Sequence, residues 1–172
     1  MVWINDSSHT ATNVIITDEP PVDTTYLGGL TCVPAGATVV TSCTFDPNVG
    51  PRGTVTVVGD IAPDPGATTQ DNASNELVIS FDVTLDNPGV EQTIENQAEL
   101  NWDSDGDGTV DFTVPTDDPA ALGATDPTVV QVGALAATGV QINTTVVAGA
   151  IIATAAGALT VAAKLSRRGD HS

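Results

Sequence analysis

Positive charge is nearly absent from this sequence. Of its 172 residues, 4 are lysine or arginine and 22 are aspartate or glutamate, giving a formal net charge of −18. Three of the basic residues lie at the C-terminal end, so residues 1–139 carry a net charge of −20, with Arg52 as their one basic side chain. Such a surface cannot neutralise phosphates, which excludes nucleic acid as a partner and disfavours anionic lipid outside the basic tail. It suits solubility, high-salt tolerance or cation binding.

Histidine and catalytic motifs are also scarce. His9 is the only histidine before the C-terminal tail, no nucleophile motif surrounds a serine, and no glycine-rich phosphate loop is present. The paired carboxylates Asp117 and Asp118 lie in a proline-rich loop, where we expect them to be solvated. The sequence therefore favours a protein that is not an enzyme.

The start of the chain lacks an export signal. Residues 1–5 contain neither a basic n-region nor an apolar h-region, which excludes a secretory signal peptide there. The C-terminal end nevertheless predicts export, as described below. We therefore expect the chain to be the C-terminal piece of a longer exported protein, or its start to have been assigned wrongly.

Helical periodicity does not occur before Val140, and aromatic residues make up only 3% of the chain. The abundant threonine, valine, glycine and proline predict short strands and turns. The clearest strand is 77–85, in which apolar and polar residues alternate, and 94–102 repeats the pattern with Asn96 on the inward face. We expect Asn96 to bond to the backbone of a neighbouring loop. Disorder is the alternative, and this strict alternation argues against it.

Further strands are predicted by shorter alternating segments. In one of them Val110, Phe112 and Val114 share a face, and the others are 2–5, 13–17, 38–45, 53–61 and 128–132. Seven to eight short strands separated by turns predict an all-β protein built as an antiparallel β-sandwich.

The two cysteines are Cys32 and Cys43. Both precede the apolar C-terminal run, and the topology argued below places them outside the cytoplasm. A disulfide is the default there. A zinc site is excluded because two thiols and His9 do not supply four ligands.

The C-terminal end combines three adjacent features. The first is Leu135-Ala136-Ala137-Thr138-Gly139, the second is an uncharged, mainly apolar run of 24 residues (140–163), and the third is the basic tail 164–172. As a helix the run would be about 36 Å long, enough to cross a membrane. The basic residues after it predict that this end stays in the cytoplasm and that everything before Val140 lies outside.

This order of motif, spanning segment and basic tail resembles the cell-wall sorting signal of Gram-positive surface proteins, whose usual motif is Leu-Pro-x-Thr-Gly. Ala136 stands at the proline position, and the Leu-Ala-x-Thr-Gly variant is similar to the motif of the class E sortases of actinobacteria. The resemblance implies a transient sortase partner, cleavage between Thr138 and Gly139, and transfer of the Thr138 carboxyl to an amine of a peptidoglycan precursor. The alternative is a single-span membrane protein that keeps its helix.

The body of the chain carries a second resemblance, which covers nearly all of residues 2–132. Residues 2–5, 11–18 and Pro20 look like the opening of the repeat family called domain of unknown function eleven. Asn96, Ala98 and Leu100 match its later Asn-x-Ala-x-hydrophobic signature. The family implies an immunoglobulin-like sandwich without enzymatic activity, usually in tandem on bacterial surface proteins. One copy is present and begins inside its first strand, which again implies upstream repeats.

Residues 103–111 fit the first nine positions of an EF-hand-type calcium loop. Its ligands would be oxygen atoms of Asp103, Asp105, Asp107, Thr109 and Asp111. Val114 occupies the twelfth position, where a bidentate glutamate belongs, so binding would be weak and Asp117, Asp118 or water would have to complete the shell. The alternative is an acidic hairpin turn kept for solubility.

These features divide the chain into a surface repeat domain (1–132), a linker with the sorting motif (133–139), a transmembrane helix (140–163) and a cytoplasmic tail (164–172). We expect a structural or stalk module that holds more distal domains off a bacterial cell wall. The alternative is an adhesin-type binding module. It would need an exposed apolar or aromatic patch, drawn from Trp3, Tyr26, Phe45 and Trp102.

Overall fold

The computed structural model describes residues 1–66, 74–87, 91–105, 107–117 and 125–133, with short strand segments between 146 and 165. The described residues form strands and turns, and none of them lies in a helix. The prediction of an all-β protein is confirmed for this part of the chain. The strands up to residue 133 are β1 (Val2–Asn5), β2 (Ala11–Asp18), β3 (Thr24–Pro34), β4 (Val39–Asp46), β5 (Thr54–Ile61), β6 (Glu76–Leu85), β7 (Gln92–Asn96), β8 (Glu99–Trp102), β9 (Phe112–Pro115) and β10 (Thr128–Val132).

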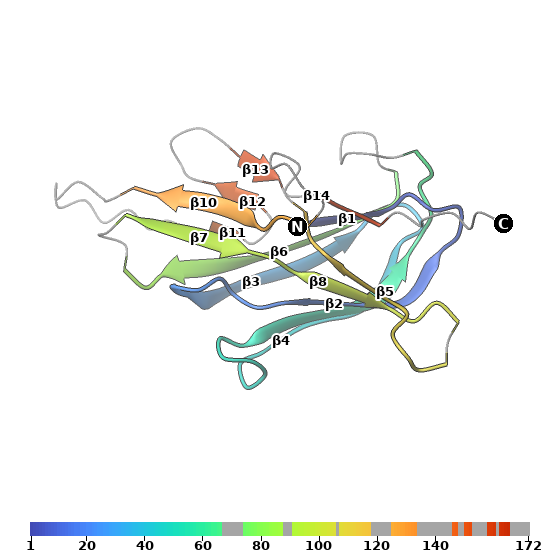
Figure 1. Ribbon diagram of the computed structural model, residues 1–172, viewed down its shortest axis with the longest axis horizontal. Coiled ribbons are helices and arrows are strands. Elements are labelled where there is room, and N and C mark those ends of the chain that lie inside the picture. The colour runs from blue at the N-terminus through green and yellow to red at the C-terminus, as the bar shows by residue number, and fades with distance from the viewer. Residues whose placement is uncertain are drawn as a thin grey trace.

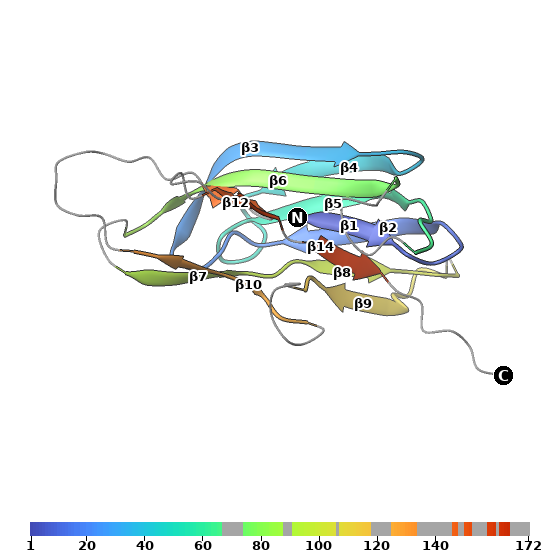
Figure 2. The ribbon, with the colours of Figure 1, turned by 90° about the horizontal axis from the view of Figure 1, so that it is seen from above.

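The strands form predominantly antiparallel sheets arranged in layers (Figures 1 and 2). In one sheet, β6 pairs with β3 along most of its length and with β1 at its start. A second sheet has the order β4-β5-β2-β8-β9, and β7 pairs with β10 in a third. The first two sheets share one hydrophobic core.

The core follows from the alternation in β6. Leu77, Ile79, Phe81 and Val83 are each at most 1% exposed and form one cluster with apolar side chains of the second sheet. Those partners are Val14 and Ile16 of β2, Val55 and Val57 of β5, and Leu100 and Trp102 of β8. Burial of one such side chain contributes about 1.5–3 kcal/mol, so this face of β6 holds the two sheets together.

The disulfide between Cys32 and Cys43 is formed, as predicted, with 6.2 Å between the Cα atoms. Cys32 lies on β3, which pairs with β6 in the first sheet, whereas Cys43 lies on β4, which pairs with β5 in the second. The bond therefore ties together strands of the two facing sheets.

The predicted single strand 94–102 is wrong, because the chain forms two strands that belong to different sheets. The break falls at Gln97 and Ala98, whose polar groups bond outside the ladders. Gln97 Nε2 donates to the carbonyls of Thr116 and Thr125, at 3.1 and 2.6 Å. Ala98 N donates to Thr116 Oγ1 at 3.0 Å, and Thr116 N donates to Ala98 O at 2.8 Å. These bonds interrupt the strand between β7 and β8, which follow one another along the molecule in Figure 2.

Strand β3 was not predicted, because bulges interrupt its alternation. Its pairing with β6 shifts register between Tyr26 and Gly28 and again between Gly28 and Thr31. Gly29 has φ +68°, and a Cβ built on it would lie 2.4 Å from Asp82 Oδ2. Glycine adopts this left-handed conformation without steric cost and leaves room for the Asp82 side chain, so it favours the bulged pairing of β3 with β6 at this point.

The face shared by Val110, Phe112 and Val114 is only partly buried. Val114 packs against the core, while Val110 is 50% exposed and Phe112 is 44% exposed. The strand β9 begins at Phe112 and pairs with β8. The Phe112 ring stacks on Trp102 with 5.5 Å between ring centroids, so it covers the end of the core without entering it.

The predicted sorting motif, transmembrane helix and basic tail lie outside the described residues, apart from four short strand segments. These are β11 (Val146–Val147), β12 (Ala150–Ile152), β13 (Ala158–Thr160) and β14 (Ala162–Leu165). Among the described residues no helix has the length and apolar character needed to cross a membrane. The motif and the helix therefore stay predictions.

Candidate functional site

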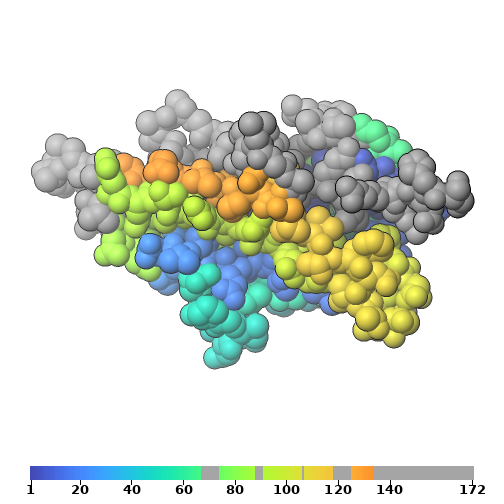
Figure 3. All heavy atoms as spheres, viewed as in Figure 1, coloured from blue at the N-terminus to red at the C-terminus, as the bar shows by residue number. Residues whose placement is uncertain are grey.

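The predicted calcium loop connects β8 to β9 at one end of the molecule, where residues of this segment project in yellow in Figure 3. Trp102 pairs with Phe112, and Asp111 N donates to Trp102 O at 3.0 Å, which closes the base of the loop. Gly108 has φ +89°, the left-handed conformation that a glycine adopts without steric cost. The sequence predicted both the hairpin and this turn.

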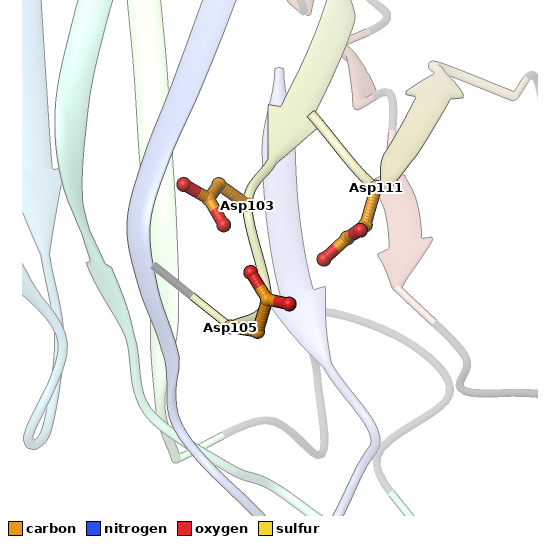
Figure 4. A group of neighbouring side chains, drawn as sticks. All are labelled: Asp103, Asp105 and Asp111. Carbon is orange, nitrogen blue, oxygen red and sulfur yellow. The ribbon is translucent and has the colours of Figure 1, made fainter. Parts of the chain in front are cut away.

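Three carboxylates of the loop converge. Asp103, Asp105 and Asp111 each offer an oxygen, and these three oxygens lie within 4.8 Å of one another. In Figure 4 the carboxylates of Asp105 and Asp111 face each other across the loop, and the carboxylate of Asp103 lies next to that of Asp105. Oxygen ligands lie about 2.3–2.6 Å from a calcium ion, so two of them can be about 5 Å apart on one ion. The spacing therefore fits a single calcium ion.

Asp107 and Asp117 do not join this group. The Asp107 carboxylate is turned into the loop, where Oδ1 accepts a hydrogen bond of 2.7 Å from Thr109 N. Asp117 follows β9, at the end of the hairpin opposite the loop. The four residues of β9 separate Asp117 from the loop by about 13 Å, at roughly 3.3 Å per strand residue. Its Oδ1 accepts a bond from Asp126 N at 3.2 Å. Asp117 is therefore a wrong prediction for completing the shell, and Asp118 lies outside the described residues.

The loop's own N–H groups already stabilise these carboxylates. Asp103 Oδ2 accepts from Gly108 N at 2.7 Å, and Asp105 Oδ1 accepts from Asp107 N at 3.1 Å. Asp111 Oδ2 accepts from both the N–H and the hydroxyl of Ser104. These bonds hold the acidic loop compact by themselves. The loop geometry therefore fits both a calcium site and an acidic turn.

A second polar arrangement was not foreseen from the sequence. The Asp18 side chain, at the end of β2, is 2% exposed, and its Oδ2 accepts a hydrogen bond of 3.0 Å from Asn96 Nδ2. Asn96 thus bonds to a side chain and not, as predicted, to a loop backbone. Burial raises the pKa of Asp18 to about 7, outweighing the Asn96 bond, which lowers it. The signal was available, since period-2 counting along β2 places Asp18 on the same buried face as Val14 and Ile16.

An open hollow of about 460 Å³ lies beside this pair. Arg52 and Glu19 both line it, and Arg52 Nη2 pairs with Glu19 Oε2 at 2.9 Å. Arg52 Nε also donates a hydrogen bond to the Pro20 carbonyl. The hollow is also lined by Asp18, Pro21, Val22, Glu95, Asn96 and Glu99. A neighbouring hollow of about 320 Å³ shares Val22, Glu95 and Gln97 with it.

Comparison with known proteins identifies no family for this chain. The chain matches no protein-family model, no curated protein and no solved structure. The two resemblances drawn from the sequence therefore stay hypotheses.

Proposed function

We propose that residues 1–132 form an immunoglobulin-like structural module of a bacterial surface protein. In this proposal a sortase joins Thr138 to peptidoglycan, and the module holds other domains off the cell wall. The observation that carries the proposal is the disulfide between Cys32 and Cys43, which ties the two sheets together. Disulfides form and persist outside the reducing cytoplasm, which supports export. The acidic surface and the all-β fold accord with this role.

The distribution of aromatic side chains favours a structural role over an adhesin. Of the six aromatic residues, Trp3, Phe81 and Trp102 are buried, and Tyr26 and Phe45 stack on each other at 3.7 Å and pack against the core. Phe112 is the most exposed of the six, at 44%. Binding hot spots are enriched in tryptophan and tyrosine, and both tryptophans and the tyrosine of this domain lie in its core or pack against it.

The anchoring step is tested by replacing its acyl donor. Thr138→Ala should remove the protein from the peptidoglycan fraction and leave it in the membrane, whereas the control Thr144→Ala, inside the predicted helix, should anchor normally. Wild-type protein that detergent alone extracts with residues 164–172 attached would favour the single-span membrane protein.

We also propose that the loop 103–111 binds calcium weakly through Asp103, Asp105 and Asp111. The support is the spacing of the three carboxylate oxygens within 4.8 Å. Without a glutamate at position 114, the affinity belongs to the extracellular class, with a Kd of roughly 10⁻⁴–10⁻³ M. A bound ion would offset the repulsion among the carboxylates and stabilise the β8–β9 hairpin.

Thermal unfolding distinguishes this site from an acidic turn. Millimolar calcium should raise the Tm more than sodium chloride of equal ionic strength does. Asp105→Asn combined with Asp111→Asn should abolish the difference. Asp107→Asn removes the same kind of charge from the same loop but outside the group, and it should preserve the calcium effect. If calcium and sodium chloride raise the Tm equally, the loop is a screened acidic turn.

A further inference from the structure

The hollow beside Asp18 is separate from the calcium loop, and two of its lining residues carry buried acceptors without a hydrogen-bond partner among the described residues. Asp18 Oδ1 is buried and has no hydrogen-bond partner among the described residues, and the same holds for Asn96 Oδ1. The two side chains bond to each other through their other atoms, Asn96 Nδ2 and Asp18 Oδ2, so both acceptors belong to one pair. A buried acceptor without a donor destabilises the fold, and more so when it is charged. The pair therefore favours a ligand that donates hydrogen bonds.

The lining of the hollow favours a positively charged ligand. Four carboxylates line it, from Asp18, Glu19, Glu95 and Glu99, against the single guanidinium of Arg52. Arg52 is already committed to Glu19 and to the Pro20 carbonyl. The remaining carboxylates create a negative potential that concentrates cations in the hollow.

The spacing of these groups argues against a metal ion. Among the described residues, Asp103, Asp105 and Asp111 form the group of three carboxylates within 4.8 Å, and no carboxylate of the hollow belongs to it. A cation with its own N–H donors does not need such convergence. The volume of about 460 Å³ lies in the usual range for small organic ligands. Pro21 and Val22 add apolar surface to the lining, on which an alkyl chain can pack.

We propose that this hollow binds a primary ammonium group carried on an alkyl chain. The ammonium nitrogen has three donors on one atom, two of which would satisfy Asp18 Oδ1 and Asn96 Oδ1. Glu95 adds a carboxylate at the rim, and the alkyl chain packs on Pro21 and Val22. The only lysine of the chain is Lys164, in the tail that follows the predicted membrane span. The other ammonium of the chain, that of Met1, is buried, donates to Ile79 O at 2.8 Å and interacts electrostatically with Asp18. The proposed ligand is an ammonium of another molecule, either a lysine side chain of a partner protein or a free alkylamine.

Calorimetric titration of the full chain tests this at pH 7.5 and low ionic strength. The probes are n-butylammonium and the peptide acetyl-Gly-Lys-Gly-amide. The control is the same peptide with norleucine in place of lysine, which keeps the alkyl chain and lacks the ammonium. We expect at least one ammonium probe to bind and the norleucine peptide not to bind. Asp18→Asn should weaken binding at least tenfold.

Glu95→Gln keeps the test decisive if Asp18→Asn folds poorly, because Glu95 is exposed. It should weaken binding severalfold, while Glu91→Gln removes a charge of the same kind outside the hollow and should not. Similar affinity for both ammonium probes assigns the hollow to free alkylamines, and a tenfold preference for the peptide assigns it to a partner's lysine. The proposal is overturned if neither ammonium probe binds, or if Glu95→Gln and Glu91→Gln bind equally well.

Discussion

The buried carboxyl of Asp18 predicts a specific dependence of stability on pH. Its pKa is raised from 3.8 to about 7 in the folded protein, chiefly by burial. A raised folded-state pKa means that the stabilisation from the neutral carboxyl is complete below about pH 4 and is lost as the pH rises through 7. At about 1.4 kcal/mol per pKa unit, the wild type loses roughly 4 kcal/mol from this group between pH 4 and pH 8.

Asp18→Asn removes this titration, because the amide stays neutral and its oxygen can still accept the bond from Asn96. The variant should therefore gain stability relative to wild type as the pH rises from 4 to 8, by up to roughly 4 kcal/mol. Urea unfolding at each pH measures this through tryptophan fluorescence, since Trp3 and Trp102 are 0% and 8% exposed. Comparison at equal pH cancels the titration of acidic groups that do not interact with Asp18, and Glu91→Gln should follow the wild type. The buried Met1 ammonium does interact with Asp18. Burial lowers the pKa of this ammonium and Asp18 raises it by a smaller amount, so its titration contributes to the measured difference.

Two results would refute this reasoning. A difference between variant and wild type that is constant from pH 4 to pH 8 would mean that Asp18 does not titrate in this range. A variant that is less stable than wild type, and increasingly so toward pH 8, would mean that the carboxylate is ionised and paired in the folded protein.

The disulfide and one glycine give two further predictions. In the exported protein, thiol labelling under denaturing, non-reducing conditions should find no free cysteine, and stoichiometric labelling of both thiols would contradict the disulfide. The double variant Cys32→Ser with Cys43→Ser should have a free energy of unfolding about 2–3 kcal/mol lower than that of the wild type. Gly59→Ala should destabilise the fold by about 1–3 kcal/mol, because its Cβ would lie 2.2 Å from Val39 O and push β4 away from β5. Gly133→Ala, with no atom within 4 Å of its Cβ, is the control and should change stability little.

The sequence was most informative where one local rule decides the structure. The alternation in β6 identified Ile79 and Phe81 as core residues, because a strand with one buried face has a period of two. The disulfide was predictable because Cys32 and Cys43 are the only cysteines. The hairpin around the loop 103–111 followed from glycine and aspartate between two alternating segments.

The features that were missed depend on contacts between distant segments. Strand β3 has no regular alternation in its sequence because Gly28 and Gly29 lie where its pairing with β6 is bulged. The division between β7 and β8 depends on Thr116, which holds Ala98 from 18 residues away. The Asp18–Asn96 pair joins residues 78 positions apart, and no local pattern relates them.

The central claim, anchoring of an exported module to the cell wall, is tested most directly by the chemical state of Thr138. The wild-type protein should be released from purified cell walls by a muramidase, and the C-terminal peptide of the released protein should be analysed by mass spectrometry. The account predicts a peptide that ends at Thr138 and is joined by an amide bond to a peptidoglycan fragment. A peptide that continues through Gly139 into residues 140–172 would contradict it.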